Sequence, residues 1–352
     1  MLGSAISLGV FSVAMYYMLQ YRDWLDWNKS FIYRVTPGPC QYVTKGGGSE
    51  DLTHIGDGIV LISSAYYRGL YSGAILRLNL TSNDVTPMEI VGGPGTSDFM
   101  FFIHGISTWK DPETGILELY VLTHPSKGDK IEVFEMTGEY QLTYARSITD
   151  PRFTFMNDLV VVGRDKFYIT KFWEYRDKLK HFLETLLWMK YGGIFYYDGT
   201  HAREMVSGLD LPNGINVSPD GRMVYTAEYN NKKVLAYHRD EYNMLTKAWE
   251  VYADSAVDNI EVDPITGDLW IGCHPIAYRV LDTVYKVFGY TLPSQVLRFK
   301  MRDNMVSEIE EIYADDSTNL AGSTVATYVD GKLVIGTAAS KTLVCDVKYH
   351  SK

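Results

Sequence analysis

The sequence predicts an all-β protein, a six-bladed β-propeller that follows an N-terminal hydrophobic helix and carries a few peripheral helices. Three observations predict this fold. A turn followed by a strand recurs six times along 352 residues, aromatic residues make up 14% of the chain, and a polar residue opens each repeat. Aromatic residues favour strands over helices, and turn-bounded strand pairs at a regular period are typical of propeller blades.

The six turns are rich in Gly, Asp and Pro, the residues that reverse the chain most readily. They lie at residues 56–58, 111–115, 163–165, 218–221, 263–267 and 330–331. Each turn is followed by an apolar run of the β type, at residues 59–62, 117–122, 167–170, 223–227, 269–272 and 333–336. Six repeats in series predict six blades in one propeller that spans residues 40–352.

The N-terminal stretch contains no charged side chain through residue 21. About 20 apolar residues can span a bilayer. A cleaved signal peptide is the alternative, with a weak small-residue site at 12–14. No basic residue precedes the stretch, and Tyr16, Tyr17 and Tyr21 suit a membrane interface. We therefore expect residues 1–21 to form an uncleaved signal anchor.

A signal anchor would place the protein in the secretory pathway. Residues 22–39 would then be a juxtamembrane segment, with the propeller in the ER lumen or outside the cell. Asn28 and Asn79 each begin an Asn-x-Ser/Thr sequence and are predicted to be glycosylated. Asn216 begins a third, but it lies in a predicted inner strand, so we do not expect its use. The net charge of −10, without a long basic run, argues against a nucleic acid partner.

The three cysteines, Cys40, Cys273 and Cys345, match no zinc-binding spacing. In an oxidising compartment they indicate one disulfide and one free thiol. A bridge between Cys40 and Cys345 would close a very long loop and stabilise the fold by on the order of 4–5 kcal/mol in the chain-entropy model. Cys273 lies in an apolar strand pattern, which predicts that its thiol is buried.

The polar residues that open the repeats predict a metal site. They are Glu50, His104, Asn157, Asn213, Asp258–Asn259 and Ser323–Thr324. The innermost strands of a propeller line its central channel, so six such strands aim these side chains at one axis. The Glu, Asp and Asn oxygens would form a cage that suits calcium, whereas zinc prefers Cys and His. The alternative is that these residues only stabilise turns.

The sequence therefore predicts a central calcium tunnel. Asp51 and Asp158 directly follow two of the cage residues and predict a second cation deeper in the tunnel. Adjacent strand residues face opposite ways or lie at different levels, so two acids displaced from the cage could hold this second cation. The alternative is that the acidic pair is simply solvated.

A helix is predicted outside the repeat, over residues 175–191, because apolar residues recur there at helical spacing. Four basic residues, Arg176, Lys178, Lys180 and Lys190, give it a charged face. Such a helix can lie at a membrane interface or over the mouth of a pocket. The alternative is a helix packed on the propeller.

Seven segments resemble the serum paraoxonase/arylesterase family. They are residues 48–52, 104–108, 157–158, 213–221, 257–259, 263–275 and 322–326. The segments follow one another in the family's order between Cys40 and Cys345, which is nearly the whole chain, and the hydrophobic N-terminus also resembles that of the family. The resemblance implies a calcium-binding propeller, a disulfide between Cys40 and Cys345, and a free thiol at Cys273.

The resemblance also implies the roles of individual residues. A catalytic calcium would be held by Glu50, Asn157, Asn213, Asp258 and Asn259. A second, structural calcium would be held by Asp51, Asp158 and the backbone carbonyl of Ile106. A histidine dyad would consist of His104 and His124. The substrate pocket would include Tyr66, Trp270, His274, Leu281 and Thr324.

The activity implied is calcium-dependent hydrolysis of lactones and aryl esters by a membrane-anchored enzyme. The substrate carbonyl would bind the catalytic calcium, and His104, oriented by His124, would take a proton from water. Where the family has an acid–histidine pair, this chain has residues 171–173 (Lys-Phe-Trp). The alternative function is therefore a membrane-tethered chaperone or accessory subunit for ion-channel assembly, with a membrane-protein partner and little or no hydrolase activity.

Overall fold

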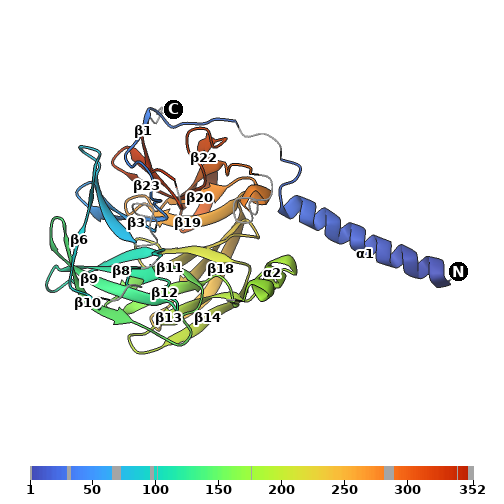
Figure 1. Cartoon of the computed structure of the whole chain (residues 1–352), viewed down its shortest axis with the longest axis horizontal. Coiled ribbons are helices and arrows are strands. Elements are labelled where there is room, and N and C mark those ends of the chain that lie inside the picture. Colours follow the sequence, from blue (N-terminus) through green and yellow to red (C-terminus); the bar gives the residue numbers. More distant parts are fainter. Residues whose placement is uncertain are drawn as a thin grey trace.

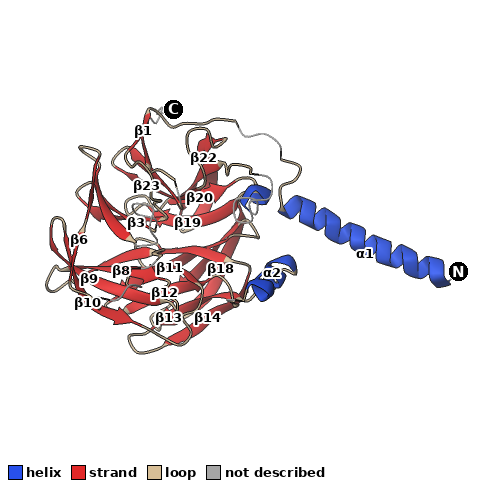
Figure 2. Ribbon diagram, in the orientation of Figure 1, coloured by secondary structure: helices blue, strands red, loops and turns tan. Residues whose placement is uncertain are grey.

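The computed structural model describes residues 2–29, 33–65, 73–95, 99–100, 102–175, 177–280, 289–338 and 340–347. The strands form six sheets of four or five strands each, and every pairing is antiparallel except that of one edge strand. Figure 1 shows the sheets arranged as the blades of a propeller, and Figure 2 shows that strands dominate the body. The predicted six-bladed β-propeller is therefore confirmed.

The first three blades follow the chain from the N-terminal side. Blade one contains β2 (Asp51–Gly56), β3 (Ile59–Ser64), β4 (Ala74–Asn79) and β5 (Asp84–Pro87). Blade two contains β7 (Ile106–Lys110), β8 (Leu117–Thr123), β9 (Lys130–Gly138), β10 (Gln141–Ile148) and the parallel edge strand β6 (Glu89–Val91). Blade three contains β11 (Met156–Gly163), β12 (Lys166–Lys171), β13 (Gly192–Tyr197) and β14 (Ala202–Leu209).

The remaining three blades complete the ring. Blade four contains β15 (Pro212–Val217), β16 (Met223–Glu228), β17 (Lys233–Arg239) and β18 (Leu245–Tyr252). Blade five contains β19 (Ala256–Val262), β20 (Leu269–His274), β21 (Ser294–Arg302) and β22 (Met305–Asp315). Blade six contains β23 (Ser323–Val329), β24 (Lys332–Thr337), β25 (Leu343–Asp346) and β1 (Cys40–Tyr42).

The six predicted turns each join the first two strands of a blade. In blade one, the turn between β2 and β3 places Asp57 at φ 50° and Gly58 at φ 67°. Gly adopts this left-handed region without a steric penalty, and Asp tolerates it better than most residues. The Gly and Asp content of the repeats was therefore a valid turn signal.

The inner strands contact one another around the ring in the order β2, β7, β11, β15, β19 and β23, and β23 returns to β2. Apolar side chains fill the space between neighbouring blades. Tyr225 of blade four, for example, shares a core cluster with Ile271 of blade five. Burying one large apolar side chain contributes roughly 1.5–3 kcal/mol relative to exposure, so these contacts hold the blades at fixed positions around the axis.

The ring is closed by the two ends of the propeller. Strand β1, from the N-terminal side, pairs with β25, from the C-terminal side, in the register that sets Cys40 opposite Cys345. These two cysteines form a disulfide across 305 residues of sequence, and Cys273 is a buried free thiol. The disulfide and the free thiol are both as expected.

Removing this disulfide is expected to destabilise the propeller strongly. In the chain-entropy model, a cross-link that closes so long a loop stabilises the native state by about 5 kcal/mol. The double variant Cys40→Ser/Cys345→Ser should therefore unfold at a much lower denaturant concentration, with a steeper slope because its unfolded chain is less compact. A Cys273→Ser variant, which lacks only the free thiol, serves as the control. Equal midpoints for the double variant and the wild type would contradict this account of ring closure.

Helices α1 (Leu2–Trp24) and α2 (Lys178–Leu186) lie on one side of the ring. Helix α2 is shorter than the predicted 175–191. It begins after Asp177, whose carboxylate accepts a hydrogen bond from the Lys180 amide, and Trp188 leaves the helical conformation with φ 50°. A capping side chain marks the N-terminal end of a helix, and a residue in the left-handed conformation marks its C-terminal end. Among the described residues, no helix is both long and apolar enough to cross a membrane.

The C-terminal end of α1 is attached to the propeller, while the rest of the helix extends away from it (Figure 1). Tyr21 of α1 stacks on Trp188, with ring centroids 4.5 Å apart. Just beyond α1, the buried Asp26 carboxylate contacts Lys232 Nζ at 2.5 Å and accepts a hydrogen bond from the Ala277 amide. A buried, hydrogen-bonded ion pair of this kind fixes where α1 leaves the body.

Candidate metal centre and active site

The five predicted ligands of the catalytic calcium converge at one end of the inner strands. They are Glu50, Asn157, Asn213, Asp258 and Asn259, and each is at most 7% exposed. Asn259 Nδ2 donates hydrogen bonds to the backbone oxygen of Glu50 at 2.9 Å and to its Oε1 at 3.0 Å. Because the amide nitrogen is engaged in this way, its oxygen is left free to face another group.

Four oxygens of this cage have no hydrogen-bond partner although protein encloses them. They are Glu50 Oε2, Asn157 Oδ1, Asn213 Oδ1 and Asn259 Oδ1. An enclosed oxygen without a partner costs about 1–3 kcal/mol. Burial also raises the pKa of Glu50 and of Asp258 well above the ordinary carboxyl range. A cation at the centre of the cage would satisfy the oxygens and balance the charge, so the donor set fits Ca²⁺.

The cage is not a site of the His and Cys type. The described residues contain no group of three or more His, Cys, Asp and Glu side chains that could hold a metal. In the cage, three of the five donors are Asn amides, which offer neutral oxygens. Hard cations such as Ca²⁺ accept this chemistry, whereas zinc does not favour it.

Irregularities in the inner strands bring two adjacent residues to the axis. The strand register shifts between Met156 and Leu159, between Pro212 and Ile215, and between Val257 and Ile260. In a regular strand, adjacent side chains point to opposite faces, but a bulge removes this alternation. The shifts therefore allow consecutive residues such as Asn157 and Asp158 both to face the tunnel.

Glycine lets the inner strands approach closely at this level. A Cβ on Gly105 would lie 2.3 Å from Asp158 Oδ1, and a Cβ on Gly214 would lie 2.5 Å from the Cα of Asn259. Neither position can accept a larger residue without displacement of the backbone. Gly105 and Gly214 are thus required for the spacing of the ligands.

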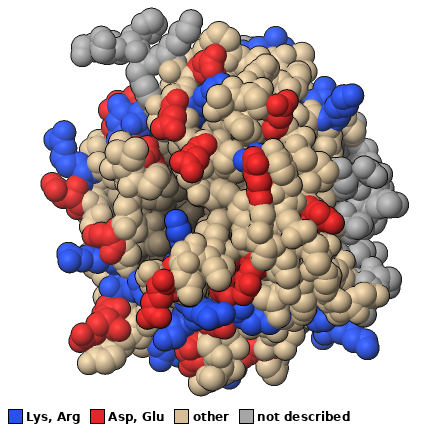
Figure 3. Space-filling model, turned by 90° about the vertical axis from the view of Figure 1, so that its left-hand side faces the viewer, with Lys and Arg blue, Asp and Glu red and all other residues tan. Residues whose placement is uncertain are grey.

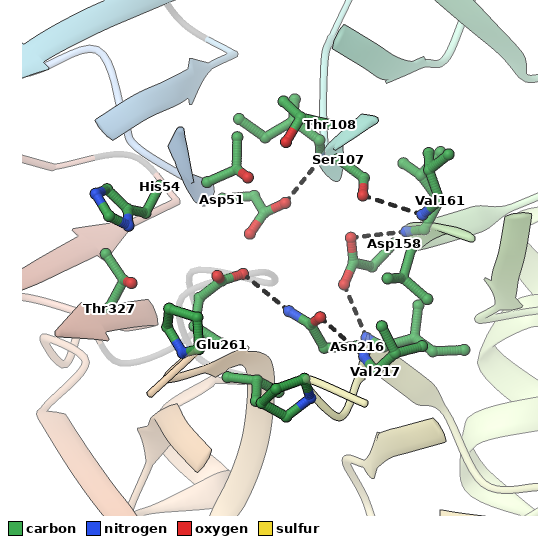
Figure 4. Close-up of a pocket in the computed structure, with 18 of the residues that line it drawn as sticks. Asp51, His54, Ser107, Thr108, Asp158, Val161, Asn216, Val217, Glu261 and Thr327 are labelled. Carbon is green, nitrogen blue, oxygen red and sulfur yellow. Dashed lines mark hydrogen bonds between the residues drawn. The ribbon is translucent and has the colours of Figure 1, made fainter. Parts of the chain in front are cut away.

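Asp51 and Asp158, the predicted ligands of the structural calcium, face a second cavity at the other level of the tunnel. This cavity has a volume of about 300 Å³, and Ile106 also lines it. Figure 4 shows the two carboxylates pointing into the space. Asp51 Oδ2 accepts the amide hydrogen of Ile106 at 2.7 Å, and Asp158 Oδ2 accepts that of Ile215 at 2.8 Å. Burial raises the pKa of Asp51 to about 7.

The two predicted histidines lie together in an upper cavity of about 280 Å³ that reaches Asn157 of the cage. The rings of His104 and His124 meet edge to face, with centroids 4.6 Å apart. His104 Nδ1 and His124 Nε2 are enclosed without hydrogen-bond partners. Burial, and then the neighbouring His124, lower the pKa of His104 well below its usual value. His104 is therefore neutral at pH 7.

A buried carboxylate orients the second histidine. Asp129 Oδ1 lies 3.0 Å from His124 Nδ1, while its Oδ2 accepts the Met156 amide hydrogen at 2.8 Å. This contact fixes the Nδ1–H tautomer of His124 and turns Nε2 away from Asp129. The sequence analysis missed Asp129 because it lies in a loop outside the repeat, where no spacing marks it.

The wall of the upper cavity is aromatic. Besides the histidines it includes Phe102, Phe155, Phe172 and Trp173. Phe172 and Trp173 belong to the segment where the sequence departs from the expected acid–histidine pair. Their rings lie 4.3 Å apart, so the departure replaces polar groups by an apolar surface suited to an aryl ring or acyl chain.

The five predicted pocket residues have different positions. Tyr66 and Leu281 lie outside the described residues. Trp270 is not at the pocket wall but in the core between blades five and six, where its ring stacks on Tyr328 at 5.0 Å. The expectation for Trp270 is corrected because its ring faces the neighbouring blade. Thr324 donates a hydrogen bond to the backbone oxygen of Glu50 and supports the cage.

His274 lies next to the cage and has an unexpected partner. Its Nδ1 is 2.7 Å from the Tyr229 hydroxyl and 3.7 Å from Asp258 Oδ2. Burial lowers the pKa of His274 to about 4, so this imidazole is neutral. Tyr229 was not predicted because it opens no repeat and belongs to no recognised motif.

The propeller face away from α1 carries acidic and basic side chains intermingled around a central hollow (Figure 3). The helical side differs, because α1 and α2 expose large apolar side chains there. They are Phe11, Met15, Tyr16, Tyr17, Met18 and Leu19 on α1, and Leu179 and Leu183 on α2.

Comparison with known proteins identifies relatives of the whole propeller. The family model described as Arylesterase matches residues 32–347. Human serum paraoxonase/arylesterase 1 is 35% identical over 313 residues, which cover 85% of this chain and 86% of the relative. Chicken serum paraoxonase/arylesterase 2 is 34% identical over 324 residues, which cover 88% of this chain and 89% of the relative. Rabbit serum paraoxonase/lactonase 3 is 30% identical and covers 85% of each chain.

Solved structures share the fold at much lower identity. A gluconolactonase from Xanthomonas campestris has a TM-score of 0.54 at 14% identity, covering 90% of this chain and 91% of the other. The calcium-binding protein regucalcin from Agrobacterium tumefaciens has a TM-score of 0.55 at 14% identity. The match covers 90% of this chain and 96% of the regucalcin chain. At this identity the likeness concerns the propeller fold alone.

Proposed function

The chain belongs to the arylesterase family and is an esterase or lactonase, and on this premise we propose that its hydrolysis of lactones and aryl esters depends on two bound calcium ions. One observation carries the proposal: four enclosed oxygens of the cage have no partner within the protein. A single cation on the axis would give all four a partner. The acid groups of the second cavity would hold the other ion.

The substrate would enter through the upper cavity, where aromatic residues can hold its apolar part. A bound calcium ion would act as a Lewis acid toward the ester carbonyl oxygen. His104 lies in the same cavity and is neutral, so its imidazole can accept a proton from the attacking water. His124, held by Asp129, borders His104 and can orient it or carry the proton onward.

To test this, the purified full-length protein is assayed for hydrolysis of a panel of lactones and aryl esters. Each substrate is assayed in calcium, after chelation, and after calcium is restored. We expect turnover that chelation abolishes and calcium restores. Turnover that survives complete chelation would overturn calcium dependence while leaving the hydrolase itself intact.

Replacing Asp129 by Asn is expected to lower kcat by about 10- to 100-fold, because a group that positions a catalytic histidine typically contributes this much. Asn can still accept the Met156 amide hydrogen, so the loop should keep its conformation. The calcium-dependent rise in Tm should be unchanged, since Asp129 is not in the cage. Asp240→Asn, at an exposed turn, is the control. An unaltered kcat in the Asp129 variant would exclude a positioning role.

We further propose that the protein is attached to a membrane of the secretory pathway through α1, with α2 at the lipid surface. Apolar exposure supports this: Phe11 is 61% exposed and Met18 is 62% exposed. Aromatic residues at the lipid boundary are favourable. Alkaline extraction of membranes from cells that express the full chain tests the attachment. Release of the protein into the soluble fraction would count against membrane attachment. Absence of glycans from Asn28 and Asn79 would count against the secretory pathway.

The alternative function is an accessory or chaperone subunit for a membrane protein. The apolar pair Phe172 and Trp173 at the predicted acid–histidine position favours it, as do the exposed apolar helices. The two functions differ in the lactone assay. Absent turnover, together with intact calcium binding and a membrane protein recovered by crosslinking, would favour the accessory subunit.

A further inference from the structure

Helix α1 ends on a residue that is unusual for its position. The Trp27 amide donates to the Arg22 carbonyl at 3.0 Å, and the Asp26 amide donates to the Asp23 carbonyl at 3.3 Å. This is the pattern of a Schellman motif, in which a left-handed residue, most often Gly, ends the helix. Here that residue is Asp26, with φ 57°. Because Gly would adopt this conformation without strain, the Asp side chain points to a role of its own.

The Asp26 carboxylate joins two loops of the propeller. Its Oδ1 contacts Lys232 Nζ at 2.5 Å, in the turn between β16 and β17, and Lys29 Nζ lies 3.1 Å from the same oxygen. Its Oδ2 accepts the Ala277 amide hydrogen at 3.0 Å, just after β20. Asp26 is 1% exposed and Lys232 is 3% exposed. Since breaking a buried ion pair is strongly destabilising, Asp26 holds blade four and blade five together at this point.

Each of the two loops carries a residue that lies next to the cage. Tyr229 precedes Lys232, and its backbone carbonyl accepts the Lys232 amide hydrogen at 3.2 Å. His274 is the last residue of β20 and precedes Ala277. The Tyr229 hydroxyl lies 2.7 Å from His274 Nδ1. The loops that Asp26 joins are therefore the ones that bring Tyr229 and His274 into contact.

The same loops support the aromatic wall of the upper cavity. Val280 belongs to a helical turn that begins at Ala277. Val280, Phe172 and Trp173 all pack against the cluster that contains Tyr229, and the rings of Phe172 and Tyr229 have centroids 6.5 Å apart. Phe172 and Trp173 line the upper cavity. Displacement of either loop would therefore remove the support behind this wall.

We propose that Asp26 is a positioning residue of the substrate pocket, which it stabilises by joining the loops of Tyr229 and His274. The inference rests on the proposed entry of the substrate through the upper cavity. The end of α1 is then part of the support of the pocket as well as the point where the helix attaches. The cage ligands lie on or beside the inner strands and not on these loops, so Asp26 should affect KM more than kcat.

Two double variants of the full-length protein isolate this role. Both replace Lys232 by Met, because removing both members of a buried ion pair leaves no unpaired charge and can be neutral for stability. Asp26→Asn/Lys232→Met keeps an oxygen that can accept the Ala277 amide hydrogen. Asp26→Gly/Lys232→Met suits the left-handed backbone but has no such oxygen. The comparison therefore measures what the bond to Ala277 does.

Asp26→Gly/Lys232→Met is expected to have a KM about 10-fold above that of Asp26→Asn/Lys232→Met, because a misplacement of about 1 Å in groups that hold a substrate costs up to about 100-fold. The rise should be largest for substrates with a bulky aryl or acyl group, which contact the wall. The calcium-induced rise in Tm should be equal in both variants. Asp23→Asn removes a carboxylate of the same helical turn, which pairs with Arg22, and is the control with an unchanged KM.

Hydrogen exchange gives a second measurement that does not require turnover. The amides of residues 277–280 should exchange about 10-fold faster in Asp26→Gly/Lys232→Met than in Asp26→Asn/Lys232→Met, because one buried hydrogen bond is worth about that factor. Should the Gly variant fail to fold, Ala277→Pro removes the same amide hydrogen at the first residue of a helical turn, a position that accepts Pro. It should raise KM in the same way.

The outcomes separate this inference from the function on which it rests. A wild type without turnover of any ester or lactone would refute the proposed function, and hydrogen exchange would still show whether Asp26 fixes the turn. A wild type with turnover, alongside equal KM values in the two double variants, would refute only the role of Asp26. Faster exchange with an unchanged KM would refute that role as well, because the turn would then move without effect on the substrate.

Discussion

Replacing Glu50 by Gln is expected to abolish hydrolysis and to remove most of the stabilisation that calcium gives the propeller. Glu50 supplies one of two carboxylates in the cage, and its Oε2 has no partner within the protein. An ion present at 1,000 times its Kd stabilises the native state by about 4 kcal/mol. For a domain of this size such a change corresponds to roughly 10 °C in Tm. Thermal melts with and without calcium measure it.

The same variant should behave differently after chelation. Burial raises the pKa of Glu50, so its charge is unfavourable when no cation balances it. Without calcium, Glu50→Gln should therefore be at least as stable as the wild type. Glu113→Gln, in the exposed turn of blade two, provides the control and should match the wild type under both conditions. An equal calcium-induced rise in Tm for Glu50→Gln and the wild type would show that Glu50 is not a ligand.

Replacing His104 by Gln is expected to lower kcat by about 10²- to 10⁴-fold, the usual contribution of a general base. Burial keeps His104 neutral and able to accept a proton. Gln fills a similar volume but cannot accept a proton, so the transition state loses about 3–5 kcal/mol of stabilisation. KM should change much less. Steady-state kinetics on the best lactone found in the panel measures both constants.

Folding and metal binding should be unaffected in the His104 variant, because its ring does not belong to the cage. Its calcium-dependent Tm is therefore expected to match that of the wild type within a few degrees. His238→Gln, on the exposed side of β17, is the matched control. A kcat for His104→Gln close to that of the control would assign the base to another group, of which His124 is the nearest.

Most of the fold could be predicted because it depends on local, repeated signals. The turn residues recur wherever the chain reverses inside a blade, and each apolar run that follows became the second strand of its blade. At β3, for example, the predicted run 59–62 grew to Ile59–Ser64. The helix at 175–191 was overestimated because its ends depend on a cap at Asp177 and on the conformation of Trp188, which apolar periodicity does not report.

The candidate site was predictable only in part. Glu50, Asn157 and Asn213 open their repeats, and the geometry of the inner strands brings them together. Asp129 and Tyr229 carry no comparable signal, because each acts through a partner that is distant in sequence or outside the repeat. Trp270 shows the opposite error: its motif was informative, but the direction of its ring depends on packing against Tyr328.

The sequence alone determined the number of blades and which polar residues open each inner strand, because these features follow from short-range patterns and from spacing along the chain. The pairing of Cys40 with Cys345 was implied by the resemblance to the paraoxonase/arylesterase family. Only the tertiary structure decided which carboxylates share a cavity, because bulges in the inner strands break the alternation of side chains. Asn157 and Asp158 show this: they are consecutive in β11 at a register shift, yet Asn157 borders the upper cavity and Asp158 the second one.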